Sequence, residues 1–482
     1  MSRMAGDVVG TTGDRLVRAA VLLLVAVQIV LFSSGYRLSA DDAGLTMSYL
    51  EGWDSTWAYA QGAAEQHGRI GMYVVGPMNA IASYWSSSFA VRVLFAALHF
   101  LVLLLFARLA GRWFGNDTGG VLAIVLVAVH PLAFEHMPPN AYGLQNTVPF
   151  LILLVARVYC LRPPLAGEGP HPIRVWLGRG MFVAGLLFSE YAFLFGFALV
   201  AMECWLTLLG SGGRMWSMAG VRDAARRQVA DVSMLAAALA IYALYRWSHP
   251  SHYDGNVPDG VAHAWRWAET SVRHVLAGTM LVRLDSSVLR LPAVALAIGL
   301  VAAVTGGLAV RRLLPAETGP HATLASAGMA LLLSLLVVMP VASTVKQQEW
   351  CVDGGVCGFL DSRMAYPWLI LACVLVLHWL LRAAAAREWA RPASRVASLV
   401  VAFAVLITFA YNWRQAGWMR EASAPWQRAD ALACQPASNK GVRSLIDPGG
   451  AIVMHPNVDP ESYWRDYLKR QADRPACAMR TD

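Results

Sequence analysis

Long apolar runs dominate the chain, and each run is bounded by charged or turn-forming residues. Runs of this length can cross the roughly 30 Å hydrocarbon core of a bilayer as helices, and they lack the period-2 alternation of a membrane β-barrel. Counting them predicts about 11 transmembrane helices. These are Leu16–Ser34, Phe89–Ala107, Val121–Phe134, Thr147–Leu161, two within Val175–Leu208, Val229–Trp247, Val288–Val310, Ala322–Ser343, Trp368–Leu381 and Val396–Tyr411.

The stretch Val175–Leu208 is too long for a single crossing and is interrupted by polar residues at its centre. We expect it to form two short helices with the turn at Glu190.

Composition supports an all-α polytopic membrane protein. Hydrophobic residues make up 57% of the 482 residues and charged residues only 15%, whereas soluble domains are about a quarter charged. The net charge of +8 is spread over short loops rather than gathered in one patch, so nucleic acid is not expected as a partner.

The distribution of basic residues predicts the orientation. Loops on the side of the N-terminus are rich in arginine, and the opposite loops hold roughly half as many basic residues, which places the N-terminus in the cytoplasm. An odd number of spans then leaves the C-terminus outside. We divide the chain into a membrane domain, residues 1–413, and an extracytoplasmic tail or small cap, residues 414–482.

Four of the seven cysteines fall in segments assigned to the outside, where oxidising conditions permit disulfides. Cys351 can then pair with Cys357, and Cys434 with Cys477.

The first outer loop, residues 35–88, is rich in aromatic residues of the kind found at membrane interfaces, with glycine and proline breaks between them. This pattern predicts helices that lie along the membrane surface. The tail ends in an amphipathic stretch around Tyr463–Leu468.

An acidic pair, Asp41 and Asp42, follows the first span by only a few residues. Two adjacent carboxylates at a membrane surface can supply a base that takes a proton from an attacking hydroxyl. The alternative is that either residue caps a surface helix starting near Leu45. The local sequence leaves both interpretations open.

Three basic residues in the outer loops are candidates for binding a phosphate. Arg69 lies between Gly68 and Gly71 in the first loop, and Lys346 and Arg363 lie in the last outer loop. Arginine offers a fork of donors to a phosphate, and lysine adds a point charge. Arg69 can equally be a solvated turn residue, and Arg363 can instead extend toward the interface or pair with Asp361.

Further polar residues on the same face are candidates for orienting a substrate: Glu135, His136, Glu190 and Tyr191. Each can equally be a helix cap or a solvated loop residue. No histidine or cysteine spacing predicts a metal site, and the inner loops lack a Gly-rich phosphate cradle.

The acidic pair after the first span, the Gly68-Arg69 element and the run from Arg363 to Pro367 together resemble the GT-C glycosyltransferases. The stretch from Asp41 through Gly52 and Trp53 to Arg69 is most similar to bacterial glucosyltransferases of the GtrII type, which decorate O-antigen or related surface glycans. The run from Arg363 is similar to the late-loop motif of lipid A aminoarabinose transferases.

The resemblance implies an inverting transferase in the bacterial inner membrane that moves a sugar, such as glucose, from a polyprenyl-phosphate donor to a cell-surface glycan or lipid-linked acceptor on the outer face. Asp41, with Asp42 as partner, would be the base, and Arg363, Arg69 and Lys346 would bind the donor phosphate. No cofactor is required, although the sequence leaves a divalent metal open. A flippase and a donor-synthesising enzyme are further candidate partners.

Two other functions compete with a transferase. A transporter or flippase of lipid-linked sugars is disfavoured because no charged residue lies clearly at the middle of a span and no paired broken helices are visible. An O-antigen ligase or polymerase also uses outer-loop arginines, but it does not call for an acidic pair after the first span.

Overall fold

The computed structural model describes residues 11–132, 143–161, 172–210, 218–251, 253–254, 257–260, 264–280, 291–314, 323–353, 357–358, 360–432, 442, 445 and 458–473. Within these ranges the secondary structure is helical, apart from one isolated β-bridge between Pro258 and Thr344. The longest helices are α1 (Thr11–Phe32), α5 (Phe89–Phe114), α9 (Glu190–Gly210), α10 (Met218–Ser248), α12 (Ala293–Leu313), α13 (Leu324–Ala342), α15 (Leu360–Ala385) and α16 (Ala390–Ala422).

Shorter helices complete the bundle and one of its ends. They are α2 (Ala40–Glu51), α3 (Trp53–His67), α4 (Met72–Trp85), α6 (Asn116–Ala128), α7 (Gly143–Val155) continued by the π-helical turn η1 (Ala156–Cys160), α8 (Pro172–Leu187), α11 (Ala264–Ala277), α14 (Val345–Gln348), η6 (Glu349–Asp353), α17 (Ala424–Ala431) and α19 (Pro460–Ala472).

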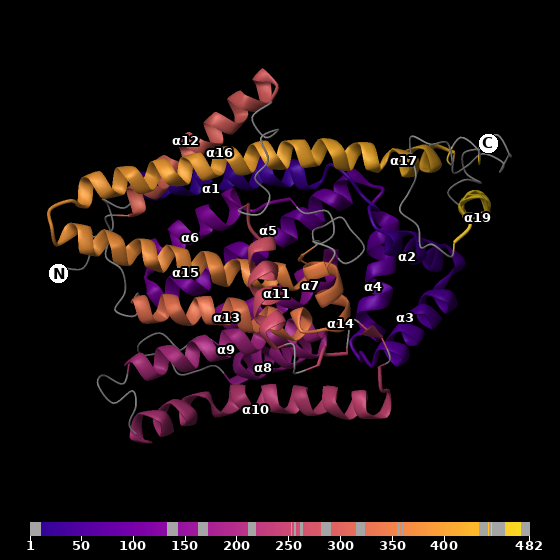
Figure 1. Ribbon diagram of the computed structural model, residues 1–482, viewed down its shortest axis with the longest axis horizontal. Coiled ribbons are helices and arrows are strands. Elements are labelled where there is room, and N and C mark those ends of the chain that lie inside the picture. The colour runs from indigo at the N-terminus through magenta and orange to yellow at the C-terminus, as the bar shows by residue number, and fades with distance from the viewer. Residues whose placement is uncertain are drawn as a thin grey trace.

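The long helices lie side by side along the longest axis of the molecule, and the helices of the first loop gather at one end of them (Figure 1). We call this the cap end: it carries α2, α3, α4, α17 and α19. The opposite end, where α8 begins and α9 ends, we call the far end.

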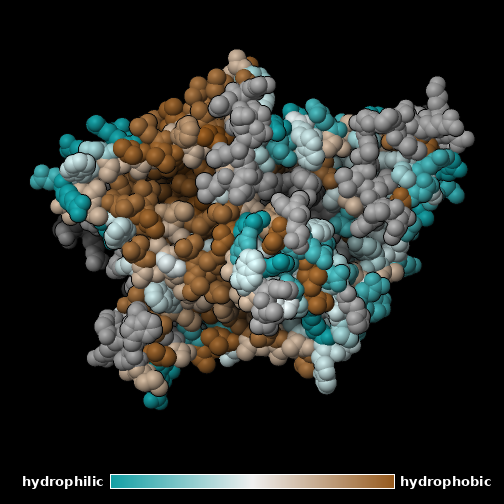
Figure 2. All heavy atoms as spheres, viewed as in Figure 1, coloured by the Kyte–Doolittle hydropathy of each residue, from teal (hydrophilic) through white to brown (hydrophobic). Residues whose placement is uncertain are grey.

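Seven of the described helices are long and apolar enough to cross a membrane: α5, α9, α12, α13, α15, α16 and the part of α10 from Gln228. Three shorter apolar segments, Val17–Phe32, Asn116–Ala128 and Leu144–Cys160, lie among them. Exposed apolar side chains such as Val301 and Phe403 cover the flanks of the bundle, and the brown surface in Figure 2 lies over this part of the molecule. The chain is therefore a membrane-embedded helical protein, as the sequence predicts.

The predicted turn at Glu190 is confirmed, because α8 ends at Leu187 and α9 begins at Glu190. The side chain of Ser189 accepts a hydrogen bond from the backbone N–H of Ala192, at 3.2 Å, which satisfies one of the free donors at the start of α9. Two elements differ from the expectation. Helix α16 runs on to Ala422, and α11 lies in a segment for which no helix was expected.

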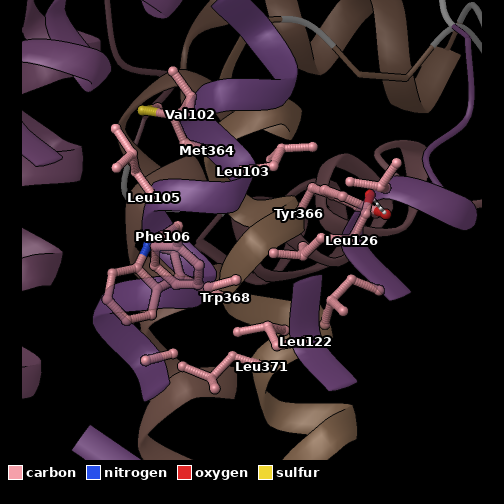
Figure 3. Close-up of a cluster of buried hydrophobic side chains, with 14 of the residues drawn as sticks. Val102, Leu103, Leu105, Phe106, Leu122, Leu126, Met364, Tyr366, Trp368 and Leu371 are labelled. Atoms are coloured by element: carbon pink, nitrogen blue, oxygen red, sulfur yellow. Dashed lines mark hydrogen bonds between the residues drawn. The ribbon is translucent and has the colours of Figure 1, made fainter. Parts of the chain in front are cut away.

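Large side chains fill the centre of the bundle. Trp368 on α15 packs edge-on against Phe106 of α5, with ring centroids 5.0 Å apart, and both are fully buried (Figure 3). Tyr366 donates a hydrogen bond from its hydroxyl to the carbonyl of Leu126 at 2.9 Å. A hydroxyl that makes a hydrogen bond costs little free energy to bury. The Tyr366 bond and the packing of Trp368 therefore hold α15 against α6 and α5.

The tail packs on the first loop through a second, separate core. Tyr463, Trp464 and Tyr467 on α19 are buried together with Trp426 of α17. The amphipathic stretch predicted near the C-terminus is thus a helix whose aromatic face covers α2.

One buried arginine joins this tail to the first loop. Arg37 donates from Nε and Nη2 to the carbonyls of Ser83 and Tyr84, at 2.9 and 2.6 Å, and from Nη1 to the hydroxyl of Tyr467 at 3.2 Å. Its Nη1 also lies 3.5 Å from a carboxylate oxygen of Asp430. The buried guanidinium therefore has partners on α4, α17 and α19, and it joins these three helices of the cap end.

Candidate functional site

Asp42 is a helix cap. Helix α2 begins at Ala40, five residues before the expected start, with Ser39 as its N-cap. The Ser39 backbone N–H and hydroxyl both donate to Asp42 Oδ2, at 3.0 and 2.9 Å, and the Ser83 hydroxyl donates to Oδ1 at 3.1 Å. This is a capping box, and a fully buried carboxylate with both oxygens bonded is poorly placed to take a proton from a substrate.

Asp41, the other member of the pair, is only partly buried and lies in the first turn of α2. Its charge acts on Tyr59 of α3: burial, with Asp41 as the second cause, raises the pKa of Tyr59 to about 12. The acidic pair therefore splits into an internal cap and a carboxylate on the surface of the first loop.

The buried cap makes stability depend on pH. Burial raises the pKa of Asp42 to about 6, above the value of about 3.9 for an unfolded aspartate. The folded state therefore binds the proton more tightly, and the stabilisation present below about pH 4 is lost as the pH rises through 6. We expect wild type to lose on the order of 2–3 kcal/mol relative to Asp42→Asn between pH 4 and 7. Chemical unfolding of both proteins across this range measures the difference, and parallel curves contradict the assignment.

The two glycines around Arg69 are required by close packing. Gly68 has φ +60°, and a Cβ there would lie 2.5 Å from the carbonyl oxygen of His249. A Cβ on Gly71 would lie 2.2 Å from the carbonyl oxygen of Phe188. Because neither position tolerates a side chain, the loop after α3 lies directly against the turn between α8 and α9, and Arg69 is held at this junction.

The structure brings Arg69 and Lys346 together around His67. Burial lowers the pKa of His67, and the positive charges of Arg69 and Lys346 lower it further. Lys346 donates to the hydroxyl of Tyr253 at 2.5 Å and stacks over Trp350, with its Nζ 4.1 Å from the ring centroid. His67 meets the Tyr253 ring edge-on, with centroids 4.7 Å apart. We call Arg69, Lys346, His67 and Tyr253 the cation cluster.

Glu190 and Tyr191 lie beside the cation cluster at the start of α9. Tyr191 is buried and lies within electrostatic range of Arg69, Glu190, Asp361 and Tyr253. Two of the predicted substrate-orienting residues are therefore neighbours of a predicted phosphate-binding arginine. The other two, Glu135 and His136, lie outside the described residues.

Arg363 lies deeper, in the first turns of α15, and is 6% exposed. Its Nη2 donates to His99 Nδ1 at 3.1 Å and to the Thr147 hydroxyl at 3.5 Å, while Nη1 has no partner among the described residues. The adjoining cavity leaves about 10 Å³ for the centre of a water-sized molecule, room for about one water. A phosphate group is larger, so it reaches Arg363 only if neighbouring side chains move.

A line of buried polar side chains runs from the first loop into the bundle. Ser83, which bonds the acidic cap, lies one turn after Asn79 on α4, and Asn79 donates to the side chain of Gln145 on α7 at 3.5 Å. The next residue, Asn146, donates to the carbonyl of Leu360 at 3.0 Å. Such a line ties α2, α4, α7 and α15 into one unit at the cap end.

Residues 351–358 hold the predicted disulfide Cys351–Cys357, and Arg273 of α11 donates to the Cys351 carbonyl at 3.1 Å. Cys434 and Cys477 lie outside the described residues. No group of three or more histidine, cysteine or acidic side chains suited to a metal ion occurs in the part of the chain that the structure describes.

Two charged groups were not anticipated from the sequence. His274 of α11 lies 2.7 Å from Asp361, and both side chains are fully buried. Arg157, Glu203 and Asp231 meet within candidate spans toward the far end. Ion pairs between helices make such charged residues tolerable within the bundle.

The chain finds no match among protein-family profiles, curated proteins or solved structures.

Proposed function

We propose that this protein is an inverting glycosyltransferase that moves a hexose from a polyprenyl-phosphate donor to a cell-surface glycan or lipid-linked acceptor. The proposed site is the cap end, on the outer face of the inner membrane, with the N-terminus in the cytoplasm. The chain would cross the membrane 11 times, through α1, α5, α6, α7 with η1, α8, α9, α10, α12, α13, α15 and α16.

The observation that carries this proposal is the cation cluster. Lys346 bonds Tyr253, and the Tyr253 ring meets His67, two residues before Arg69, so two cations from segments far apart in sequence lie at the same end of the apolar bundle. A lipid phosphate held at a membrane surface needs this combination of positive charge and apolar flanks, and both cations are partly exposed. The aromatic rings of Tyr253 and Trp350 beside Lys346 suit a sugar face as well as a cation.

Asp41 is our candidate for the base. The charge of Asp41 contributes to the raised pKa of Tyr59, whereas the cation cluster includes His67, eight residues further along α3. At 1.5 Å per residue, Tyr59 and His67 are about 12 Å apart along the helix.

The reaction then follows from these positions. The acceptor hydroxyl attacks the anomeric carbon from the side opposite the phosphate, Asp41 takes its proton, and the bond between the anomeric carbon and the phosphate oxygen breaks. Arg69 and Lys346 stabilise the charge that develops on the departing polyprenyl phosphate. Glu190 is our candidate for bonding a sugar hydroxyl, and the buried Tyr191 would support it from the first turn of α9.

Transport of a lipid-linked sugar is the second candidate, supported by the charged group of Arg157, Glu203 and Asp231 inside the bundle. A transporter moves a lipid without adding a sugar to the final glycan. The mass of the surface glycan therefore distinguishes the two functions. Only a transferase adds a sugar whose presence depends on residues of the cap end.

Mass analysis of surface glycans from source cells lacking the gene tests the proposal. Wild type should restore a hexose-sized increment. Arg69→Gln combined with Lys346→Gln should reduce it to about a tenth or less, because removal of even one transition-state donor typically costs a hundredfold or more in rate.

Arg465→Gln is the matched control, since Arg465 lies at the same end on α19 and pairs only on the surface with Glu461. It should behave as wild type at equal expression. If wild type restores no increment, the protein is not the transferase; if the double variant restores it fully, the cations do not bind the donor.

A further inference from the structure

A second polar site lies at the far end, away from the cation cluster. A cleft of about 550 Å³ opens between α5, η1, α8, α9 and α10, a volume within the range of ligand pockets. It is lined by Leu109, Arg112, Trp113, Arg157, Leu161, Val175, Arg179, Glu203, Leu206, Thr207, Gln228, Ala230 and Asp231. Three arginines, two acids and an apolar wall therefore face one space.

Arg157 is the central residue of this cleft and is 5% exposed. Its Nη1 bonds both acids, at 3.0 Å to Glu203 Oε2 and 2.8 Å to Asp231 Oδ2. One face of the guanidinium stacks on Phe182, with its carbon 4.3 Å from the ring centroid. The group is thus fixed in orientation by three neighbours.

The other edge of the same guanidinium makes no hydrogen bond within the described residues. Nε and Nη2 are buried and have no hydrogen-bond partner among the described residues. These two N–H groups point in parallel from one edge, which is the geometry that matches two oxygens of a phosphate or carboxylate. An unmet pair of buried, charged donors costs several kcal/mol unless something accepts from it.

The surroundings favour a phosphate ester with an apolar tail. Both acids already engage Arg157, so Arg112 and Arg179 give the rest of the lining a positive character. The same cleft is walled by leucines, valine and Trp113, and it lies between helices that face lipid. A small soluble acid would gain nothing from that wall, whereas the acyl chains attached to a lipid headgroup would pack against it.

We propose that this cleft is a phosphate site that takes the headgroup of a membrane lipid, with the Nε and Nη2 edge of Arg157 as its fork and Arg112 and Arg179 as flanking charges. The site is separate from the proposed transferase centre at the cap end. Its ligand need not be the donor.

The test measures the binding of dioctanoyl phosphatidic acid to the purified full chain in maltoside micelles. Titration calorimetry in phosphate-free buffer gives the affinity. Arg179→Gln should weaken binding at least about tenfold, and Arg157→Lys should do the same because lysine keeps the charge but not the fork. Arg311→Gln, an exposed arginine at the far end outside the cleft, should bind as wild type does.

Inorganic phosphate is the second probe, and it distinguishes a site for a lipid headgroup from a site for free phosphate. No binding of inorganic phosphate at millimolar concentration, with binding of the lipid, supports a lipid site. Equal binding and displacement of the lipid by inorganic phosphate overturns the lipid assignment in favour of a free-phosphate site. Absence of lipid binding, or equal affinities in all three variants, overturns the proposal. Because Arg179 is only half-buried, Arg179→Gln tests the site even if Arg157→Lys fails to fold.

Discussion

Asp41→Asn is expected to lower the turnover of a polyprenyl-phosphate hexose by about 10²–10⁴-fold, the usual contribution of a general base. The change removes one proton acceptor and leaves the cation cluster intact. The KM for the donor should therefore stay close to that of wild type while kcat falls. Steady-state kinetics on the purified protein, with a soluble acceptor analogue, measures both.

Two neighbouring carboxylates serve as controls. Asp54→Asn changes an exposed acid in the first turn of α3 and should keep wild-type kcat. Asp42→Asn should change the dependence of stability on pH, as argued for the capping box, with a much smaller effect on kcat. If Asp41→Asn keeps wild-type turnover, Asp41 is an acidic residue at a helix N-terminus worth only about 0.3–1 kcal/mol, and another group is the base.

Hydropathy predicted the bundle because the spanning helices are uniformly apolar, and the turn before Glu190 followed from a polar break in a run too long for one crossing. The same signal could not reveal α11. That helix is short and amphipathic, and it buries the polar Thr270, Ser271 and His274 along with only two small apolar side chains. It forms because α13 and α15 cover it, which is tertiary information.

The candidate site was predicted in its parts but not in its arrangement. Glycines beside Arg69 were visible in the sequence, yet the reasons for them are the carbonyls of His249 and Phe188, each more than a hundred positions away. The acidic pair was equally visible, but its division into a cap and a surface carboxylate depends on Ser83 of another helix. The ion pairs of Arg157 could not be predicted either, because its two partners lie on α9 and α10.

Arg37→Ala is expected to destabilise the cap end by about 3–5 kcal/mol, the usual effect of removing one partner from a buried charge pair. The guanidinium stacks over Trp426, 4.7 Å from the ring centroid, and its loss removes one hydrogen bond each from the carbonyls of Ser83 and Tyr84. It also removes the cation beside Asp430. Free energies of unfolding, with limited proteolysis of the tail as a local readout, measure the effect.

Arg37 also has φ +55°, an unfavourable backbone for a residue with a side chain. Its contacts therefore hold a strained turn between α1 and α2 in place, and alanine would keep the strain without the contacts. Arg470→Ala is the matched control, because Arg470 joins the same tail to the same loop through an exposed pair with Glu51 at 3.0 Å. Exposed pairs contribute about 0–1 kcal/mol. If both variants lose equally little, the aromatic packing of α19 alone holds the tail, and Arg37 is not the residue that joins the two parts of the cap end.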